Sequence, residues 1–274
     1  MKVGDLDLDV RVEGDPGGEV VVLLHGFPQH AGSWAEVWPG LVEAGYRVVL
    51  VDQRGYSPGA RPAGRRAYTA GELSADVLAL LDELSLHAAH LVGHDWGGGV
   101  AWGLASAAPD RVRTLTAVST PHPAALVRST LIGDQAARSW YIGAFLLPVL
   151  PERALLAADG RLLRRLLRGS GLPAHLVDGY ADRMAEPGAL TAALNWYRAL
   201  PLDRPRIGRI TVPTLYVWGA DDVALGPAAA AGTARWVTGP YTFVRLPDTG
   251  HWIPELAPAG LVEPLLAQLR RYSS

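Results

Sequence analysis

The chain has 274 residues, with 25 Lys and Arg against 27 Asp and Glu, so its formal net charge is −2, and 49% of its residues are hydrophobic. This predicts one globular domain with a sizeable core and room for an inserted lid. Charged residues make up only 19% without a basic excess, which argues against a nucleic-acid binder because little is available to neutralise phosphates. The sequence has no cysteine, so disulfides, zinc thiolate sites and thiol catalysis are excluded, and a reducing compartment is expected.

The start of the chain, Met1 to Asp7, lacks the basic end and the apolar run of a secretory signal. We therefore expect a cytoplasmic protein. The longest apolar stretch, residues 141–150, is too short to cross a bilayer and is interrupted by Pro148. The sequence therefore predicts no membrane-spanning helix.

Short β-branched runs alternate with helical periodicity along most of the chain. Residues 7–13 alternate apolar and polar types, as in a half-buried strand, whereas residues 20–24 form an unbroken apolar run typical of parallel strands covered on both faces. The same reasoning predicts further strands over residues 47–51, 90–92, 112–118, 214–218 and 241–246. Helical periodicity spans residues 73–84 and 98–107. This alternation predicts an α/β fold with a mostly parallel central sheet flanked by helices.

The alternation stops between residue 120 and about residue 213, where we expect helices broken by prolines. We expect residues 1–119 and 214–274 to form the core domain, and residues 120–213 to form a helical cap inserted after the sixth strand, over the sheet edge where open α/β folds bind ligands. Within the cap, the run Arg161 to Arg168 fits a membrane-surface helix or an amphipathic lid helix whose leucines pack inward. We favour the lid helix, because the run is short and the net charge is negative.

The segment Gly93 to Gly97 stands where a buried strand turns into a helix, and its spacing matches the nucleophile elbow of serine hydrolases. Its central residue is Asp95 instead of Ser. A side chain at either glycine would crowd a turn sharp enough to push residue 95 into the site. The alternative is a glycine-rich junction in which Asp95 merely caps the helix. The other motifs of the chain favour a nucleophile.

Those other motifs also follow strand ends. A His-Gly-Phe-Pro segment follows the strand at residues 20–24, at the place where this architecture supplies an oxyanion-hole amide, so the backbone N–H groups of Phe27 and Trp96 are the expected donors. Asp222 follows the strand at residues 214–218, and His251 follows the one at residues 241–246. The chain order of nucleophile, acid and histidine is that of α/β hydrolases.

These motifs resemble the α/β-hydrolase superfamily over essentially the whole chain, and specifically its epoxide hydrolase branch. The resemblance is carried by His25-Gly26-Phe27-Pro28-Gln29, Gly93-His94-Asp95-Trp96-Gly97-Gly98, Asp222 and Gly250-His251-Trp252. The family register, with Leu225 three residues further on, favours Asp222 over Asp221 as the acid. The resemblance also implies two lid tyrosines that activate the epoxide. Tyr197, in Asn195-Trp196-Tyr197-Arg198, resembles the motif of one, and Tyr141 resembles the other less specifically.

The resemblance implies the conversion of an apolar epoxide to a vicinal diol. Asp95 would attack an epoxide carbon and form an alkyl ester, whereas Ser would form an ether that water cannot readily cleave. A water deprotonated by His251 would then hydrolyse the ester, while Asp222 holds the imidazole in the needed tautomer. Tyr141 and Tyr197 would donate protons to the departing oxygen.

Two other functions are open on this scaffold. A haloalkane or haloacid dehalogenase with the same triad needs no acid, only weak donors such as indole N–H for the halide. Phe27 replaces the Asn often found there in haloalkane dehalogenases, so the sequence favours epoxide hydrolysis. The third possibility is a non-catalytic binder of a small ligand, and the complete triad argues against it.

We expect no cofactor and no metal, because the histidines outside the triad show no metal-ligand spacing. The expected partners are a small apolar epoxide and water, without nucleic acid or membrane, and the protein is expected to be a monomer or a homodimer. Some of the nine tryptophans should line an apolar substrate pocket. The candidates near the motifs are Trp34, Trp140, Trp196 and Trp252.

Overall fold

The computed structural model describes residues 1–133, 135–203 and 207–273, and these form a seven-stranded sheet and a separate two-stranded hairpin. The hairpin consists of β1 (Lys2–Val3) and β2 (Leu6–Asp7). The strands of the sheet are β3 (Val10–Glu13), β4 (Val20–Leu24), β5 (Arg47–Val51), β6 (Ala89–His94), β7 (Val112–Val118), β8 (Thr214–Gly219) and β9 (Tyr241–Leu246).

The strand order in the sheet is β3-β5-β4-β6-β7-β8-β9. β3 runs antiparallel to β5, and every other neighbouring pair is parallel, so the predicted α/β fold with a mostly parallel sheet is confirmed. The strand expected over residues 7–13 is wrong in part, because Leu6–Asp7 pairs with the N-terminal segment in the hairpin and only Val10–Glu13 joins the sheet.

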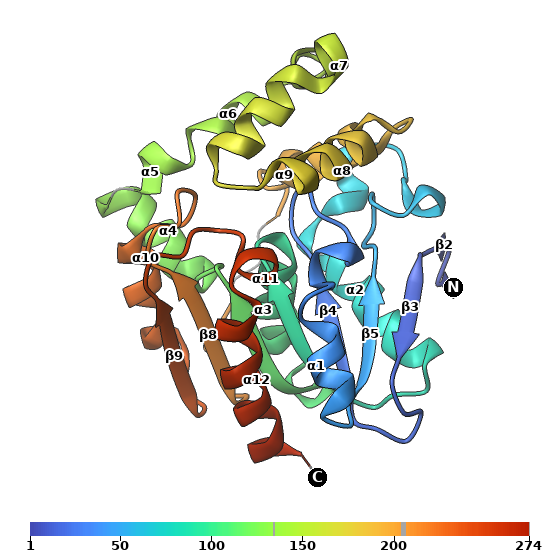
Figure 1. Cartoon of the computed structure of the whole chain (residues 1–274), viewed down its shortest axis with the longest axis vertical. Coiled ribbons are helices and arrows are strands. Elements are labelled where there is room, and N and C mark those ends of the chain that lie inside the picture. The colour runs from blue at the N-terminus through green and yellow to red at the C-terminus, as the bar shows by residue number, and fades with distance from the viewer. Residues whose placement is uncertain (134, 204–206, 274) are drawn as a thin grey trace.

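Helices cover both faces of the sheet (Figure 1). Those of the core are α1 (Trp38–Glu43), α2 (Ala70–Glu83), α3 (Trp96–Ala107), α10 (Pro227–Gly232), α11 (Ile253–Leu256) and α12 (Pro258–Tyr272). Successive residues of β4 point to opposite faces: Val22 and Leu24 pack in the core cluster that includes α2 and α3, whereas Val21 and Leu23 pack with α1 and α12. This is why the strand is apolar without alternation.

Among the described residues between β7 and β8 there are six helices, namely α4 (Pro123–Ile132), α5 (Gln135–Arg138), α6 (Trp140–Phe145), α7 (Leu150–Gly169), α8 (Ala174–Ala185) and α9 (Ala189–Ala199). In Figure 1, α6 to α9 stand over the carboxyl ends of the parallel strands. The segment follows the fifth strand of the described sheet in chain order, not the sixth as expected, because the strands of that sheet that precede it are β3, β4, β5, β6 and β7.

The amphipathic run in α7 behaves only partly as expected. The helix is interrupted at residues 157–160, where the backbone leaves helical geometry. Beyond the break, Leu163 and Leu167 are buried, whereas Leu162 and Leu166 are 41% and 45% exposed. Within the described ranges, no helix is long and apolar enough to span a membrane.

Polar contacts fasten the helices above the sheet to the core. Arg183 of α8 donates to the Asp52 carboxylate after β5, and Arg61 donates to Glu186 at the end of α8, with 2.6 Å between nitrogen and oxygen. Arg61 also donates to the Pro187 carbonyl at 3.0 Å. α8 is therefore held at the edge of the sheet from which the site residues project.

Candidate active site

Asp95 stands at a sharp turn between β6 and α3, with φ of 49° and ψ of −118°. A non-glycine residue in this region is strained, and such strain is typical of nucleophile elbows. The turn is possible because both flanking positions are glycines. A Cβ at Gly93 would lie 2.2 Å from the Gly97 carbonyl oxygen, and one at Gly97 would lie 2.2 Å from the Leu24 carbonyl oxygen. The elbow thus depends on close backbone packing against β4.

We expect Gly97→Ala to destabilise the protein by about 1–3 kcal/mol, because backbone atoms of β4 must move to admit the methyl group. Gly99→Ala is the matched control, since nothing lies within 4 Å of its Cβ position in the same helix. It should be neutral or stabilising by up to about 1 kcal/mol. Thermal unfolding compares the two, and equal midpoints would contradict the packing argument.

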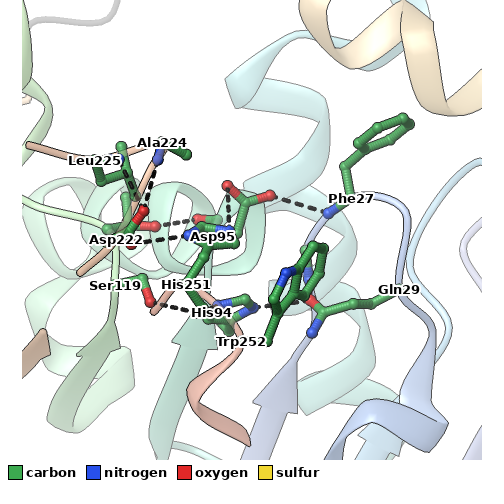
Figure 2. A network of polar contacts seen from close by, with 12 residues as sticks. Phe27, Gln29, His94, Asp95, Ser119, Asp222, Ala224, Leu225, His251 and Trp252 are labelled. Carbon is green, nitrogen blue, oxygen red and sulfur yellow. Dashed lines mark hydrogen bonds and ion pairs between the residues drawn. The ribbon is translucent and has the colours of Figure 1, made fainter. Parts of the chain in front are cut away.

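The loop after β4 places a backbone donor on the Asp95 carboxylate. Phe27 N donates to Asp95 Oδ2 at 3.0 Å (Figure 2). Gly26 makes this approach possible, because a Cβ there would lie 2.4 Å from Asp95 Cβ. Trp96 is the first residue of α3, where backbone N–H groups have no partner within the helix. Its role as the second oxyanion donor stays a prediction.

His251 lies between Asp95 and Asp222 (Figure 2). Its Nδ1 is 2.9 Å from Asp222 Oδ2, and its Nε2 is 3.8 Å from Asp95 Oδ1. The other Asp222 oxygen, Oδ1, accepts from the amides of Ala224 at 2.8 Å and Leu225 at 2.9 Å. The structure therefore places Asp222 against the histidine, whereas Asp221 is exposed.

Two side chains fix the backbone of the histidine. His94 Nε2 lies 2.9 Å from the His251 carbonyl oxygen, and Ser119 Oγ donates to the same oxygen at 2.9 Å. Ser119 follows β7, and the sequence analysis did not select it. Ser119 and His251 are 132 positions apart in the sequence, so their contact depends on the fold and not on a local motif.

Both the sequence and the fold of this chain are similar to those of known proteins. Residues 19–258 match the family model described as the alpha/beta hydrolase fold. The AB hydrolase superfamily protein YfhM of Bacillus subtilis is 36% identical over 98% of this chain and 96% of its own. Epoxide hydrolase A of Mycobacterium tuberculosis is 33% identical over 94% and 92%. The crystal structure of Epoxide Hydrolase A from Mycobacterium thermoresistibile superposes with a TM-score of 0.86 at 29% identity, covering 98% of this chain and 97% of that one.

The chain belongs to the α/β hydrolase family. The resemblance predicted from the motifs, including its epoxide hydrolase branch, is confirmed, because relatives with that name cover nearly the whole chain. The family fold places the elbow, the acid and the histidine at strand ends on one edge of the sheet, as observed here.

Three carboxylates, those of Asp222, Asp95 and Glu255, lie close to His251. Burial by itself lowers the pKa of His251, but Asp222, Asp95 and Glu255 together raise it to about 9. The raised pKa favours the imidazolium form of His251 at neutral pH. Esterification of Asp95 would remove one of these charges and lower the His251 pKa, so that a larger fraction of the imidazole is neutral and able to accept a proton.

Both predicted tyrosines stand above the nucleophile in one aromatic cluster. The Tyr197 ring of α9 lies 4.9 Å from Trp96, 5.5 Å from Phe27 and 6.3 Å from Tyr141 of α6, measured between ring centroids. Burial raises the pKa of both hydroxyls, and the Asp95 charge raises each further. The two phenols therefore keep their protons and are available as donors.

The four predicted pocket tryptophans fall in different places. The Trp196 ring packs 5.7 Å from Trp96, and the Trp252 ring packs 5.2 Å from His251, between ring centroids. Trp34, in contrast, is fully buried in the cluster beneath α1 and α12, and Trp140 is 69% exposed on α6. The structure therefore brings Trp196 and Trp252 next to site residues and places Trp34 and Trp140 elsewhere, because Trp34 packs with α1 and α12 and Trp140 faces outward.

Sequence reasoning missed several residues that the fold brings to the site. Phe145 of α6 packs 5.1 Å from Tyr197, and Tyr56 packs 4.5 Å from His25. Gln29, within a quoted motif, links the oxyanion loop to Glu255. Glu255 lies four residues after His251, but His251 precedes α11, so this spacing gives no helical signal that would have suggested it.

In the described part of the chain, no group of three or more His, Cys, Asp or Glu side chains is arranged to hold a metal ion. The buried histidines are instead engaged by other partners. His122 Nε2 lies 3.0 Å from the Gly208 carbonyl oxygen, and His90 Nδ1 lies 2.9 Å from Thr114 Oγ1. The ionisable side chains at the site are those of Asp95, Asp222, His251, Tyr141 and Tyr197.

Proposed function

We propose that the protein is an epoxide hydrolase that converts a small apolar epoxide and water to a vicinal diol. The observation that carries the proposal is a carboxylate nucleophile that faces a carboxylate-paired histidine beneath two tyrosines, Tyr197 buried and Tyr141 half-buried. The names of the relatives, Epoxide hydrolase A among them, support it.

The two Asp95 oxygens have different roles in this mechanism. Phe27 N already holds Oδ2, so Oδ1 is the oxygen that attacks an epoxide carbon. The C–O bond of the epoxide breaks, and the alkoxide takes a proton from Tyr197 or Tyr141. The product is an alkyl ester of Asp95 whose carbonyl oxygen is Oδ2.

Hydrolysis of the ester uses the histidine. His251 takes a proton from water, and the hydroxide adds to the Asp95 carbonyl carbon, placing negative charge on Oδ2 at the Phe27 amide. The bond to Oδ1 then breaks, the His251 imidazolium returns a proton to that oxygen, and the diol leaves with it. The proton of the new Asp95 carboxyl group restores the tyrosine that donated to the epoxide. Asp222 stabilises the imidazolium formed in this step, and the water oxygen remains in the regenerated carboxylate.

Two contacts argue against a dehalogenase. Trp196 Nε1 donates to the Arg54 carbonyl at 3.0 Å, and Trp252 Nε1 donates to Ser170 Oγ at 3.0 Å. These two indole N–H groups are therefore engaged and not available to a leaving halide. The phenols of the aromatic cluster provide the stronger acid that an epoxide requires.

The direct test offers an aryl epoxide and a bromoalkane to the wild-type protein and to Tyr197→Phe. We expect diol from the epoxide, and about a 10²-fold loss of diol formation in the variant, where Tyr141 is the only phenol left over the nucleophile. Chromatography measures the diol and an ion electrode measures bromide. Bromide release without any diol, unaffected by Tyr197→Phe, would assign the protein to the dehalogenases.

We also propose that residues 120–213 act as the cap and residues 1–119 and 214–274 as the catalytic core. The position of α6 to α9 over the strand ends supports this division, as does the origin of both tyrosines in that segment. The cytoplasmic location and the choice between monomer and homodimer stay predictions.

A further inference from the structure

A second group of buried polar side chains lies beside the triad, under the oxyanion loop. Gln29 Oε1 accepts from Gly26 N at 2.8 Å and lies 2.8 Å from His94 Nδ1. Because the backbone N–H of Gly26 is a donor, the amide oxygen of Gln29 must face it, and its NH₂ group must face the other way. That NH₂ group donates to Glu255 Oε1 at 2.6 Å.

Glu255 receives a second hydrogen bond on the same oxygen. Tyr180 of α8 donates to Glu255 Oε1 at 2.8 Å. The other oxygen, Oε2, is buried and has no partner in the described ranges. A proton on Oε2 would thus find no acceptor there, while two donors meet Oε1, so the contacts favour the ionised carboxylate. Burial raises the Glu255 pKa, and the two hydrogen bonds oppose that shift.

Glu255 therefore connects three parts of the protein. Tyr180 comes from the helical segment above the sheet, Gln29 from the oxyanion loop, and Glu255 itself from α11, directly after the histidine motif. A second contact joins the histidine motif to the helical segment above the sheet, because Trp252 Nε1 donates to Ser170 Oγ at the end of α7.

The charge of Glu255 also acts on the base. The ionisable groups that face His251 are Asp95 on the elbow, Asp222 after β8, His94 on β6 and Glu255 on α11. Three of them are carboxylates that favour the imidazolium. Once Asp95 is esterified, only Asp222 and Glu255 remain to stabilise the positive charge that develops on His251 during ester hydrolysis.

We propose that Glu255 is a positioning residue for the hydrolysis half of the reaction. Its hydrogen bond with Gln29 holds the loop that supplies the Phe27 amide, and its hydrogen bond with Tyr180 holds α8. Its negative charge stays near His251 after Asp95 has become an ester. The kinetic part of this inference rests on the proposed epoxide hydrolase function.

The first test follows the titration of the His251 imidazole by NMR in the free protein. Glu255→Gln keeps the size of the side chain and an acceptor oxygen but removes the charge, so the His251 pKa should fall by about one unit, a tenfold change in the proton dissociation constant. Glu263→Gln on the exposed side of α12 removes one surface charge as a control and should leave the titration unchanged. A His251 titration that is the same in Glu255→Gln and in the wild type would overturn the proposal.

The second test separates positioning from a general structural role. In single turnovers, Glu255→Gln should slow hydrolysis of the alkyl-enzyme about tenfold and move its acid limb to lower pH, while the alkylation rate stays as in the wild type. Tyr180→Phe removes the hydrogen bond to α8 but not the charge, so the acid limb should stay in place. A Glu255→Gln variant that slows both steps alike, with the acid limb unmoved, would contradict the role in hydrolysis.

Failure of the proposed function gives a different result. If the wild-type protein forms no diol from any aryl epoxide, the epoxide hydrolase assignment is lost. The NMR titration needs no substrate and still decides whether Glu255 acts on His251.

Discussion

Replacing His251 with Gln is expected to stop catalysis after the first half-reaction, so that the alkyl ester of Asp95 accumulates. Attack needs the Asp95 carboxylate and the tyrosines, whereas hydrolysis needs a base at the Nε2 position, 3.8 Å from Asp95 Oδ1. The Gln amide cannot accept a proton from water at neutral pH. Steady-state diol formation should fall by about 10⁴-fold or more. After exposure to an aryl epoxide, intact-mass spectrometry should show a gain equal to one whole epoxide.

The control for this experiment is His87→Gln, which changes an exposed histidine and should turn over normally without an adduct. A His251→Gln protein that still forms diol at the wild-type rate would remove the histidine from the mechanism. A mass gain equal to an alkyl group without its halide, seen only with haloalkanes, would point to the dehalogenase chemistry instead.

Replacing Asp95 with Asn is expected to abolish the covalent step itself. The amide oxygen can still accept the hydrogen bond from Phe27 N, so the oxyanion loop has no reason to move. The amide lacks the negative charge and nucleophilicity of the carboxylate, so diol formation should fall by about 10⁴-fold or more. In the Asp95→Asn, His251→Gln double variant, the epoxide adduct of the single variant should be absent by intact-mass spectrometry.

Asp221→Asn provides the matched control, since it makes the same chemical change at an exposed carboxylate next to the proposed acid. Its activity should remain within about twofold of the wild type. An adduct that persists in the double variant would mean that another side chain is the nucleophile. An isotope experiment gives an independent check. In a single turnover in ¹⁸O-labelled water, the diol should carry an unlabelled oxygen that comes from Asp95.

Much of the fold followed from local patterns in the sequence. The strands at residues 20–24, 47–51, 112–118 and 241–246 were predicted with the bounds that the structure gives them. This was possible because a strand buried on both faces must be apolar at successive positions. The N-terminal region was predicted less well, because its alternating pattern fits an edge strand and a hairpin equally.

The location of the reacting groups was also predictable from local sequence. Asp95 stands between two glycines that no other residue could replace without backbone overlap. Asp222 and His251 follow strands, and parallel strands bring their carboxyl ends to the same edge. Because Asp95, Asp222 and His251 each follow a parallel strand, their positions in the sequence already predict that the three side chains meet at one edge of the sheet.

The segment above the sheet was far less predictable. Its helices were expected, but neither their angles nor the residues that face the site follow from periodicity. Trp140 and Tyr141 are neighbours in the sequence, yet the first is 69% exposed and the second packs against Tyr197. Which face of a short helix points inward depends on what lies beneath it.

The sequence by itself determined the α/β hydrolase fold and the places of the proposed nucleophile Asp95 and the proposed base His251, because steric and chemical requirements confine these to short motifs. Only the tertiary structure decided which of the candidate tryptophans lie next to site residues and that Glu255 joins Gln29 to Tyr180, and it placed Asp222, which the sequence had favoured, against the histidine. The physical reason is that these contacts join segments far apart in the chain, where packing and burial set the partner and local sequence does not.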